Sequence, residues 1–230
     1  MTTVRVYKFF AFISYSHVDA CFAKELQQFL EHYKLPSELC RKYPDKPDNL
    51  RPIYRDHTDL VIDKLNDAIR SGLEVSKYLI VLCSEDSAKP NKEGKSWVNE
   101  EIKTFVSLDP ENEHRIIPIL LRKNDNVDPI SCMPSMIKKL DILAVDVVEK
   151  GKERVFSDVV AKMLGLEPDE IWKRWERLQR QRTFIRRFVY LGGLYYYYCL
   201  VCLRGIFVFQ KCIIIVIMWS VTIHRRDCTN

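Results

Sequence analysis

Glycine is scarce in this sequence, with 7 residues among 230. A glycine-rich phosphate loop needs several glycines close together, because its backbone must turn sharply and approach the ligand closely. No such cluster is present. Motifs for Ser-His-Asp or Cys-His catalysis are also missing, and His32, His57 and His114 stand isolated as expected surface residues.

A basic face on the folded part of the chain is also lacking. Residues 172–230 hold eleven Lys and Arg against two Asp and Glu, a charge of about +9, while residues 1–171 sum to about −4. Nucleic-acid binding requires positive charge on the domain itself. We therefore expect no nucleic-acid partner.

The eight cysteines show neither disulfide nor zinc spacing. No signal peptide precedes the first apolar run, so reduced thiols are expected. Cys199 and Cys202 lie in a hydrophobic run without a second ligand pair at zinc spacing. No metal site is predicted.

Short apolar runs alternate with amphipathic stretches along the first two-thirds of the chain. This alternation predicts a parallel sheet flanked by helices, an α/β fold. Asp19 is placed to cap the first helix, and residues 84–96 are expected to form a loop. The expected strands are 9–15, 52–54, 78–83, 116–121 and 143–147.

The composition changes from Pro168 onward. Proline suits the first turn of a helix, and residues 168–187 are predicted to form a basic juxtamembrane helix after a domain at 1–167. Residues 188–223 are apolar enough for one or two transmembrane helices, with a short basic tail at 224–230.

Two arrangements of the apolar tail remain open. A hairpin leaves Arg186 and Arg187 at one end and Arg225 and Arg226 at the other, which keeps both ends cytoplasmic. A single tilted span would bury a basic residue at 204 or 211, which is costly. Two adjacent glycines followed by four tyrosines are unusual in a lipid-facing helix, so a truncated or out-of-frame remnant is a third reading.

Three motifs in register resemble the TIR domain, in the form that bacterial proteins join to a membrane segment. They are FISYSH at 12–17, Arg55-Asp56, and WVNEEI at 97–102. The resemblance spans residues 8–165 and implies a flavodoxin-like five-stranded parallel sheet. Many bacterial members hydrolyse NAD⁺ to nicotinamide and an ADP-ribose product, whereas other members only assemble with partner TIR domains.

The resemblance assigns the catalytic role to Glu101, four residues after the Trp of the motif. Cleavage of the nicotinamide–ribose bond passes through an oxocarbenium-like state that a carboxylate stabilises. Trp97 and Glu101 stand at i and i+4, so they share one face of a helix, whereas Glu100 points away into solvent. The alternatives are a surface carboxylate at a helix start for Glu101 and a core position for Trp97.

The substrate-binding candidates are expected where strands end. Open α/β sheets bind ligands outside the carboxyl ends of their strands. His17 is a candidate phosphate contact, with a surface or N-cap role as its alternative, and Arg55 is suited to a phosphate or to an ion pair with Asp56 or Asp59. The full set is Ser14, Tyr15, Ser16, His17, Tyr54, Arg55, Asp56 and Trp97.

One departure from the family concerns the segment after Leu60. Relatives carry a small insert with Pro, Ser or Gly there, but this chain continues directly to Val61. Without glycine the loop has less backbone freedom. Loop closure, and with it catalysis, is therefore less favoured.

The sequence thus leaves three functions. The first is a membrane-anchored NAD⁺ glycohydrolase, switched on by TIR clustering, acting in antiviral defence and needing no cofactor. The second is a non-catalytic adaptor that associates with other TIR domains, and the third is a pore-forming effector. The expected partners are NAD⁺, other TIR domains and lipid, with the domain on the cytoplasmic side of a membrane.

Overall fold

A computed structural model describes residues 7–55, 62–90, 96–177, 180–181 and 184–193, without side-chain detail for 61–67. The chain divides into two compact units, Met1–Lys173 and Arg174–Asn230. Each unit is described by itself below.

A five-stranded sheet forms the centre of the first unit. All neighbouring strands are parallel, in the order β2-β1-β3-β4-β5. This is the flavodoxin-like order, so the predicted five-stranded parallel sheet is confirmed. The strands are β1 (Phe9–Ser14), β2 (Ile53–Arg55), β3 (Ser76–Cys83), β4 (Ile116–Leu120) and β5 (Val145–Asp146).

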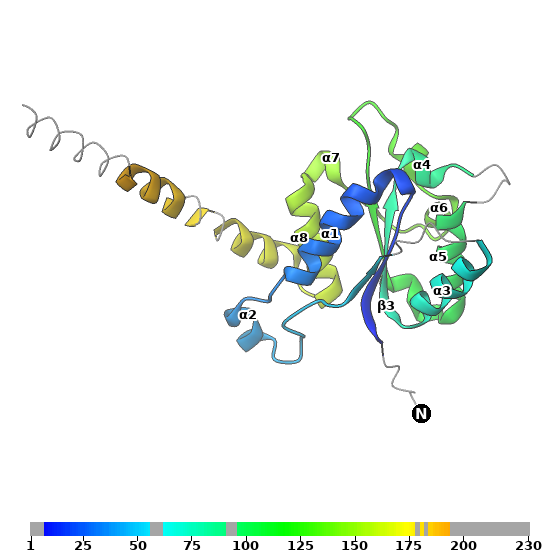
Figure 1. The fold of residues 1–230 in the computed structure, drawn as a ribbon, viewed down its shortest axis with the longest axis horizontal. Helices are drawn as coiled ribbons and strands as arrows, with labels where there is room; N and C mark the ends of the chain where they lie inside the picture. The colour runs from blue at the N-terminus through cyan, green and yellow to red at the C-terminus, as the bar shows by residue number, and fades with distance from the viewer. Residues whose placement is uncertain (1–6, 56–61, 91–95, 178–179, 182–183, 194–230) are drawn as a thin grey trace, which may run out of the picture. The chain divides into compact units, whose positions relative to one another are not determined.

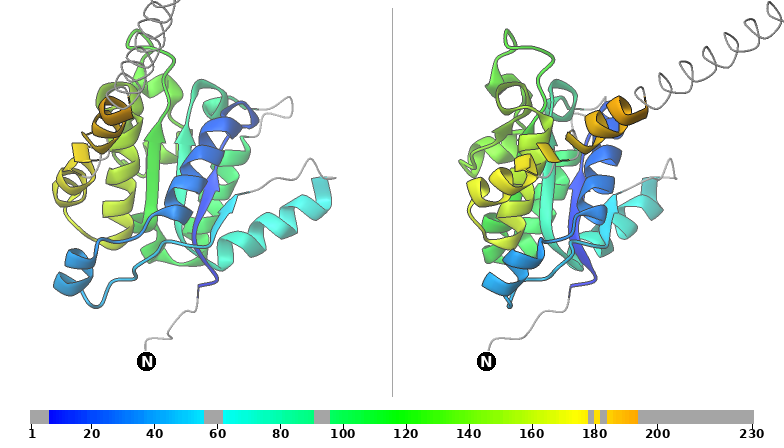
Figure 2. Two further views of the ribbon diagram at one scale, coloured as in Figure 1. Left: turned by 60° about the vertical axis from the view of Figure 1, so that its left-hand side comes forward. Right: turned by 90° about the vertical axis from the view of Figure 1, so that its left-hand side faces the viewer.

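Helices cover both faces of the sheet (Figures 1 and 2). One layer contains α1 (Ala20–His32), α7 (Val147–Lys150) and α8 (Lys152–Leu164), and the other contains α3 (Ile62–Glu74), α5 (Trp97–Leu108) and α6 (Ser135–Lys139). Shorter elements complete the unit: α2 (Ser37–Lys42), α4 (Glu85–Ala88), and the 3-10 helices η1 (His17–Asp19), η2 (Pro110–Arg115) and η3 (Pro129–Cys132).

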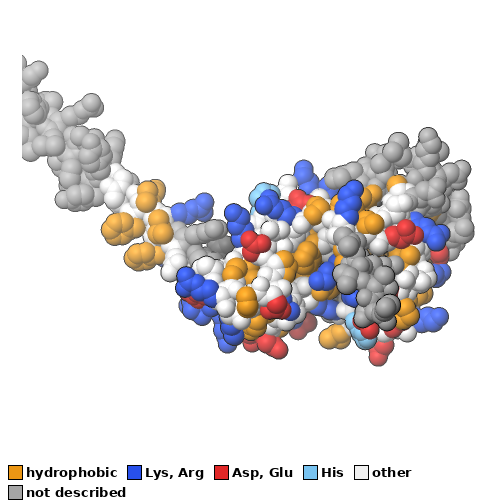
Figure 3. Space-filling view, turned by 90° about the horizontal axis from the view of Figure 1, so that it is seen from below, with side chains coloured by type: hydrophobic (Ala, Val, Ile, Leu, Met, Phe, Trp, Pro, Cys, Tyr) orange, Lys and Arg blue, Asp and Glu red, His pale blue; other side chains and the backbone are white. Residues whose placement is uncertain are grey.

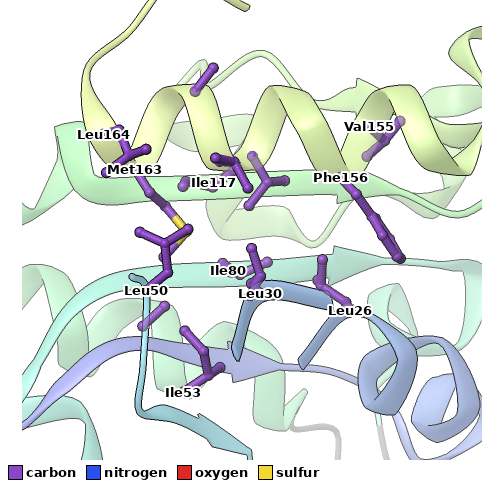
Figure 4. Packing of buried hydrophobic residues seen from close by; sticks show 14 of the residues in the cluster. Leu26, Leu30, Leu50, Ile53, Ile80, Ile117, Val155, Phe156, Met163 and Leu164 are labelled. Atoms are coloured by element: carbon purple, nitrogen blue, oxygen red, sulfur yellow. The ribbon is translucent and has the colours of Figure 1, made fainter. Parts of the chain in front are cut away.

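Each face of the sheet has its own hydrophobic core. Figure 4 shows Leu26 and Leu30 of α1 and Val155 and Phe156 of α8 packed over the sheet on one side. The opposite core contains residues of α5 and the sheet, among them Phe12, Leu79, Val81, Ile102 and Phe105. Because strand side chains alternate, Ala11 and Ile13 of β1 face the α1 side while Phe12 between them faces the α5 side.

Three local expectations differ from the structure in whole or in part. Residues 84–96 are not all loop, since α4 forms there with a capping box between Ser84 and Ser87. Asp19 stands at the N-cap of α1, but its side chain makes no capping hydrogen bond. The fifth strand spans only Val145–Asp146, and Leu143 is 90% exposed.

A further helix at 168–177 follows α8, and Arg154 connects the two. The Arg154 guanidinium bonds Asp169 at 2.5 Å and lies 5.2 Å from the centre of the Trp172 ring. On α8 itself, Arg154 also pairs with the buried Asp158 at 3.2 Å. These contacts attach the first turns of this helix to the sheet domain.

The second unit exposes apolar side chains on residues 184–193, at the left of Figure 3. Among the residues that the structure describes, no helix is both long and apolar enough to cross a bilayer. The predicted spans fall mostly at 194–223, outside the described residues. The exposed side chains are Phe184, Ile185, Phe188, Val189, Tyr190 and Leu191.

Candidate functional site

The sheet order places a crevice at the carboxyl ends of β1 and β3. After β1 the chain enters α1 on one face, and after β3 it continues to α5 on the other. Such a reversal between adjacent parallel strands is where open α/β sheets bind ligands. In Figure 1 these strand ends point upward, toward α4.

Ser14 and Glu101 meet at this edge. Ser14 is the last residue of β1, 1% exposed, and its side chain faces α5. The Ser14 hydroxyl donates a hydrogen bond to Glu101 Oε2. The partly buried carboxylate is therefore held against the end of β1, in contrast to a freely solvated helix-surface glutamate.

Trp97 lies one helical turn before Glu101, and its side chain reaches a cleft. A rise of 1.5 Å per residue separates the two positions by about 6 Å along the helix. Trp97 is 39% exposed, so it is not a core tryptophan. It borders a cleft of about 370 Å³ whose walls include Tyr15, Ser16 and His17.

Arg55 and Tyr15 form a second group, on the α1 side. The Arg55 side chain donates to the Tyr15 hydroxyl at 3.3 Å and to Gln27 Oε1 at 3.0 Å. Its guanidinium also lies 5.9 Å from the centre of the Tyr15 ring. Arg55 therefore supports the tyrosine that borders the cleft.

Tyr54 faces the opposite side of the sheet. Its ring stacks on Phe12 with a centroid distance of 5.0 Å and contacts Phe9 edge-on. The ring thus belongs to the core beneath the crevice. Asp56, and the segment 56–61 in which the family insert is missing, lie outside the described residues.

The cleft wall that α4 provides was not expected from the sequence. Asp86, Ser87 and Lys89 line the cleft opposite the end of β1. The signal for this helix was present, since Ser84 and Ser87 have the spacing of a capping box directly after a buried strand. The Ser96 hydroxyl donates to the Ser87 carbonyl at 3.1 Å, which ties α4 to the start of α5.

A half-buried acid, Asp19, lies beside this wall. The Ser84 hydroxyl donates to Asp19 Oδ2 at 2.6 Å. Burial raises the pKa of Asp19 above its ordinary value, the Ser84 hydrogen bond opposes that effect, and the charge of nearby Asp86 adds to it. Asp19 thus connects α1 to the end of β3, a role that its position in the sequence did not indicate.

The arrangement places the carboxylate of Glu101 one turn of α5 from a cleft whose lining includes the exposed Trp97, the carboxylate of Asp86 and several hydroxyls. A fixed carboxylate stabilises positive charge that develops near it, and an aromatic ring provides a stacking surface. Within the described residues no three His, Cys, Asp or Glu side chains come together as a metal-binding group.

The comparisons with known proteins identify a family. The family model described as "TIR domain" matches residues 11–159. No curated protein sequence matches the chain significantly. Among 22 matching solved chains are the TIR domains of the activated Roq1 resistosome that recognises the pathogen effector XopQ. That match has 12% identity and a TM-score of 0.40, and covers 66% of this chain and 99% of the other.

Proposed function

The chain belongs to the TIR domain family, and from this premise we propose that it is an NAD⁺ glycohydrolase that cleaves the bond between nicotinamide and ribose. The observation that supports this proposal is the placement of Glu101. Its carboxylate lies at the switch point of the sheet, bonded to Ser14 and one turn from the exposed Trp97.

The chemistry follows from the charge of the substrate. When the bond from ribose C1′ to the pyridinium nitrogen breaks, its electron pair goes to nicotinamide, which leaves neutral, and the ribose becomes oxocarbenium-like. The negative charge of Glu101 stabilises that cation and can hold the ribose hydroxyls. Water then adds to C1′ and loses a proton, which gives ADP-ribose.

The test compares two neighbouring glutamates. The full chain, held at high density on lipid vesicles, is incubated with NAD⁺, and nicotinamide release is measured by chromatography. We expect Glu101→Gln to abolish release. Glu100→Gln is the matched control, because Glu100 is exposed on the same helix and pairs with Lys103 at 2.6 Å. Unchanged turnover in Glu101→Gln would exclude the assigned site.

High density is required because we propose that clustering of TIR domains activates the enzyme. Comparison of dilute protein with protein crowded on vesicles tests this step directly. Turnover per molecule should rise with surface density for wild type. A rate independent of density would remove clustering from the proposal while leaving the chemistry intact.

A second candidate is a non-catalytic adaptor that acts by TIR–TIR association. The observation that favours it is the missing glycine-containing insert after Leu60, since a segment without glycine has less backbone freedom. An adaptor should show no NAD⁺-dependent rise in melting temperature, even when it is crowded. An enzyme should show one in the Glu101→Gln variant, which retains the cleft.

We also propose that the tail anchors the protein in a membrane with the TIR domain on the cytoplasmic side, as an effector in antiviral defence. Exposed Phe184, Phe188 and Leu191 next to an apolar stretch support anchoring. Fractionation after alkaline extraction tests it, since an anchored chain stays with the membrane. Recovery in the soluble fraction would count against the anchor.

A further inference from the structure

Lys89 occupies a particular place on the cleft. It follows directly after α4 and lines the same cleft as Trp97 and Tyr15. Among the described residues that line it, Lys89 is the only one with a permanent positive charge. Its ammonium lies 3.4 Å from Asp86 Oδ1, and the two side chains are 65% and 36% exposed.

The backbone around Lys89 is held at several points. Ser84 caps α4 through its hydrogen bond from the Ser87 N–H at 3.1 Å, and Ser96 holds the Ser87 carbonyl from the start of α5. Pro90 follows and fixes the backbone further. The backbone of Lys89 is therefore held at the cleft, while its exposed ammonium group can exchange Asp86 for another partner.

The existing partner of Lys89 holds it weakly. Solvent-exposed ion pairs at i and i+3 contribute little to stability, since water screens them and two long side chains must be ordered. A phosphate has more charge than one carboxylate and several acceptor oxygens, so it forms stronger charge-assisted hydrogen bonds with an ammonium group. A phosphate that entered the cleft would replace Asp86.

Glu101 does not itself line the cleft, but the preceding turn of α5 does. Trp97, which shares the cleft with Lys89, is about 6 Å along the helix from Glu101. A ribose held at Glu101 would direct its phosphate-bearing carbon toward the cleft or away from it. Only the first orientation uses the cleft and its one permanent cation.

We propose that Lys89 binds the phosphate of the nucleotide substrate, and that Asp86 holds Lys89 in position until substrate arrives. This inference rests on the proposed glycohydrolase function and adds a specificity to it. The enzyme should prefer a ribose that carries a phosphate and cleave nicotinamide riboside less efficiently.

The experiment compares three substrates that differ in phosphate content: NAD⁺, nicotinamide mononucleotide and nicotinamide riboside. Nicotinamide release by the full chain on vesicles is measured for wild type and Lys89→Met. We expect kcat/KM to fall about tenfold for the two phosphate-bearing substrates, mainly through KM, and to stay unchanged for the riboside. Asp86→Asn should lower KM for NAD⁺.

Lys103→Met is the matched control. Lys103 is 51% exposed and pairs at i and i+3 with Glu100, but it does not line the cleft. The Lys103→Met substitution should leave kcat/KM unchanged for all three substrates. An equal loss for all three substrates in Lys89→Met would overturn the phosphate role and indicate a structural one.

A separate measurement keeps the two proposals distinguishable. If wild type cleaves none of the substrates when crowded, the glycohydrolase proposal fails, and binding of ADP-ribose is then measured by calorimetry. Weaker binding of ADP-ribose to Lys89→Met than to Lys103→Met would still support the phosphate site. Equal binding to both variants would overturn it.

Discussion

The hydroxyl of Ser14 donates a hydrogen bond to the carboxylate of Glu101, across 87 positions of sequence. Ser14 was expected to contact substrate, but the structure places it against the proposed catalytic group. The last residue of β1 therefore orients a carboxylate that a different element, α5, carries.

The first prediction concerns Ser14. Ser14→Ala removes a hydrogen bond to a charged group, an interaction of about 1.5–3 kcal/mol. We expect kcat for NAD⁺ to fall about ten- to hundredfold, because the carboxylate loses its fixed orientation. Steady-state kinetics of protein crowded on lipid vesicles measures this fall in kcat. Ser107 is an exposed serine of α5, the helix that carries Glu101, and Ser107→Ala should leave kcat unchanged. An unaffected kcat in Ser14→Ala would contradict the orienting role.

The second prediction concerns the core beneath α1. Leu30 is fully buried, so Leu30→Ala should lower the free energy of unfolding by about 2–5 kcal/mol through lost burial and a residual cavity. Leu143 is 90% exposed, and Leu143→Ala should change stability by less than about 0.5 kcal/mol. Urea unfolding measures both. Similar effects in the two variants would contradict the short fifth strand.

The third prediction concerns the pH dependence of stability near Asp19. Burial raises the pKa of Asp19 in the folded state above its ordinary value of 3.8. The protonated form is therefore favoured by folding, so this contribution is complete below pH 3.8 and is lost as pH rises through the folded pKa.

Asp19→Asn removes that dependence. The stability of wild type relative to the variant should fall between pH 3.8 and the folded pKa and then level off. Thermal melts at a series of pH values check this, and NMR titration of the Asp19 carboxyl gives the folded pKa. A titration at or below the ordinary value would show that the Ser84 hydrogen bond outweighs burial.

The fourth prediction concerns the thiols. The four cysteines in the described part of the chain are free, and Cys83 and Cys132 are buried while Cys21 is exposed. Burial, aided by the neighbouring Cys132, raises the pKa of the Cys83 thiol, so little reactive thiolate forms near neutral pH. Iodoacetamide should label Cys21 first and reach Cys83 only after unfolding. Peptide mass spectrometry gives the order, and early labelling of Cys83 would contradict it.

The strands were the most predictable part of the fold. Runs such as YLIVLC at 78–83 are buried on both sides, and hydrophobicity alone marks them. The fifth strand was overestimated, because the apolar Leu143 resembles a strand residue although it points into solvent. Helix α4, with four residues, is too short to show a hydrophobic period.

The candidate residues of the site could be predicted from the sequence, but the hydrogen bonds that join them to distant elements could not. The motif placed Trp97 and Glu101 on one helical face, which depends only on local geometry. The bond from Ser14 to Glu101 and the bond from Ser84 to Asp19 depend on how distant elements pack. No local pattern encodes such pairs. The sequence placed Asp19 correctly at the N-cap of α1, but it did not show that the side chain bonds Ser84 and makes no capping hydrogen bond.

The position of β1 in the sheet also affects how the chain can fold during synthesis. β1 is made first, but its neighbours are β2 and β3, and the pairing of Ser14 with Val81 joins residues 67 positions apart. A nascent chain that ends before Cys83 lacks the partner that buries the middle of the sheet. Long-range parallel pairing of this kind forms slowly and leaves apolar strands exposed in the meantime. The TIR domain should therefore depend on chaperones until β3 has left the ribosome.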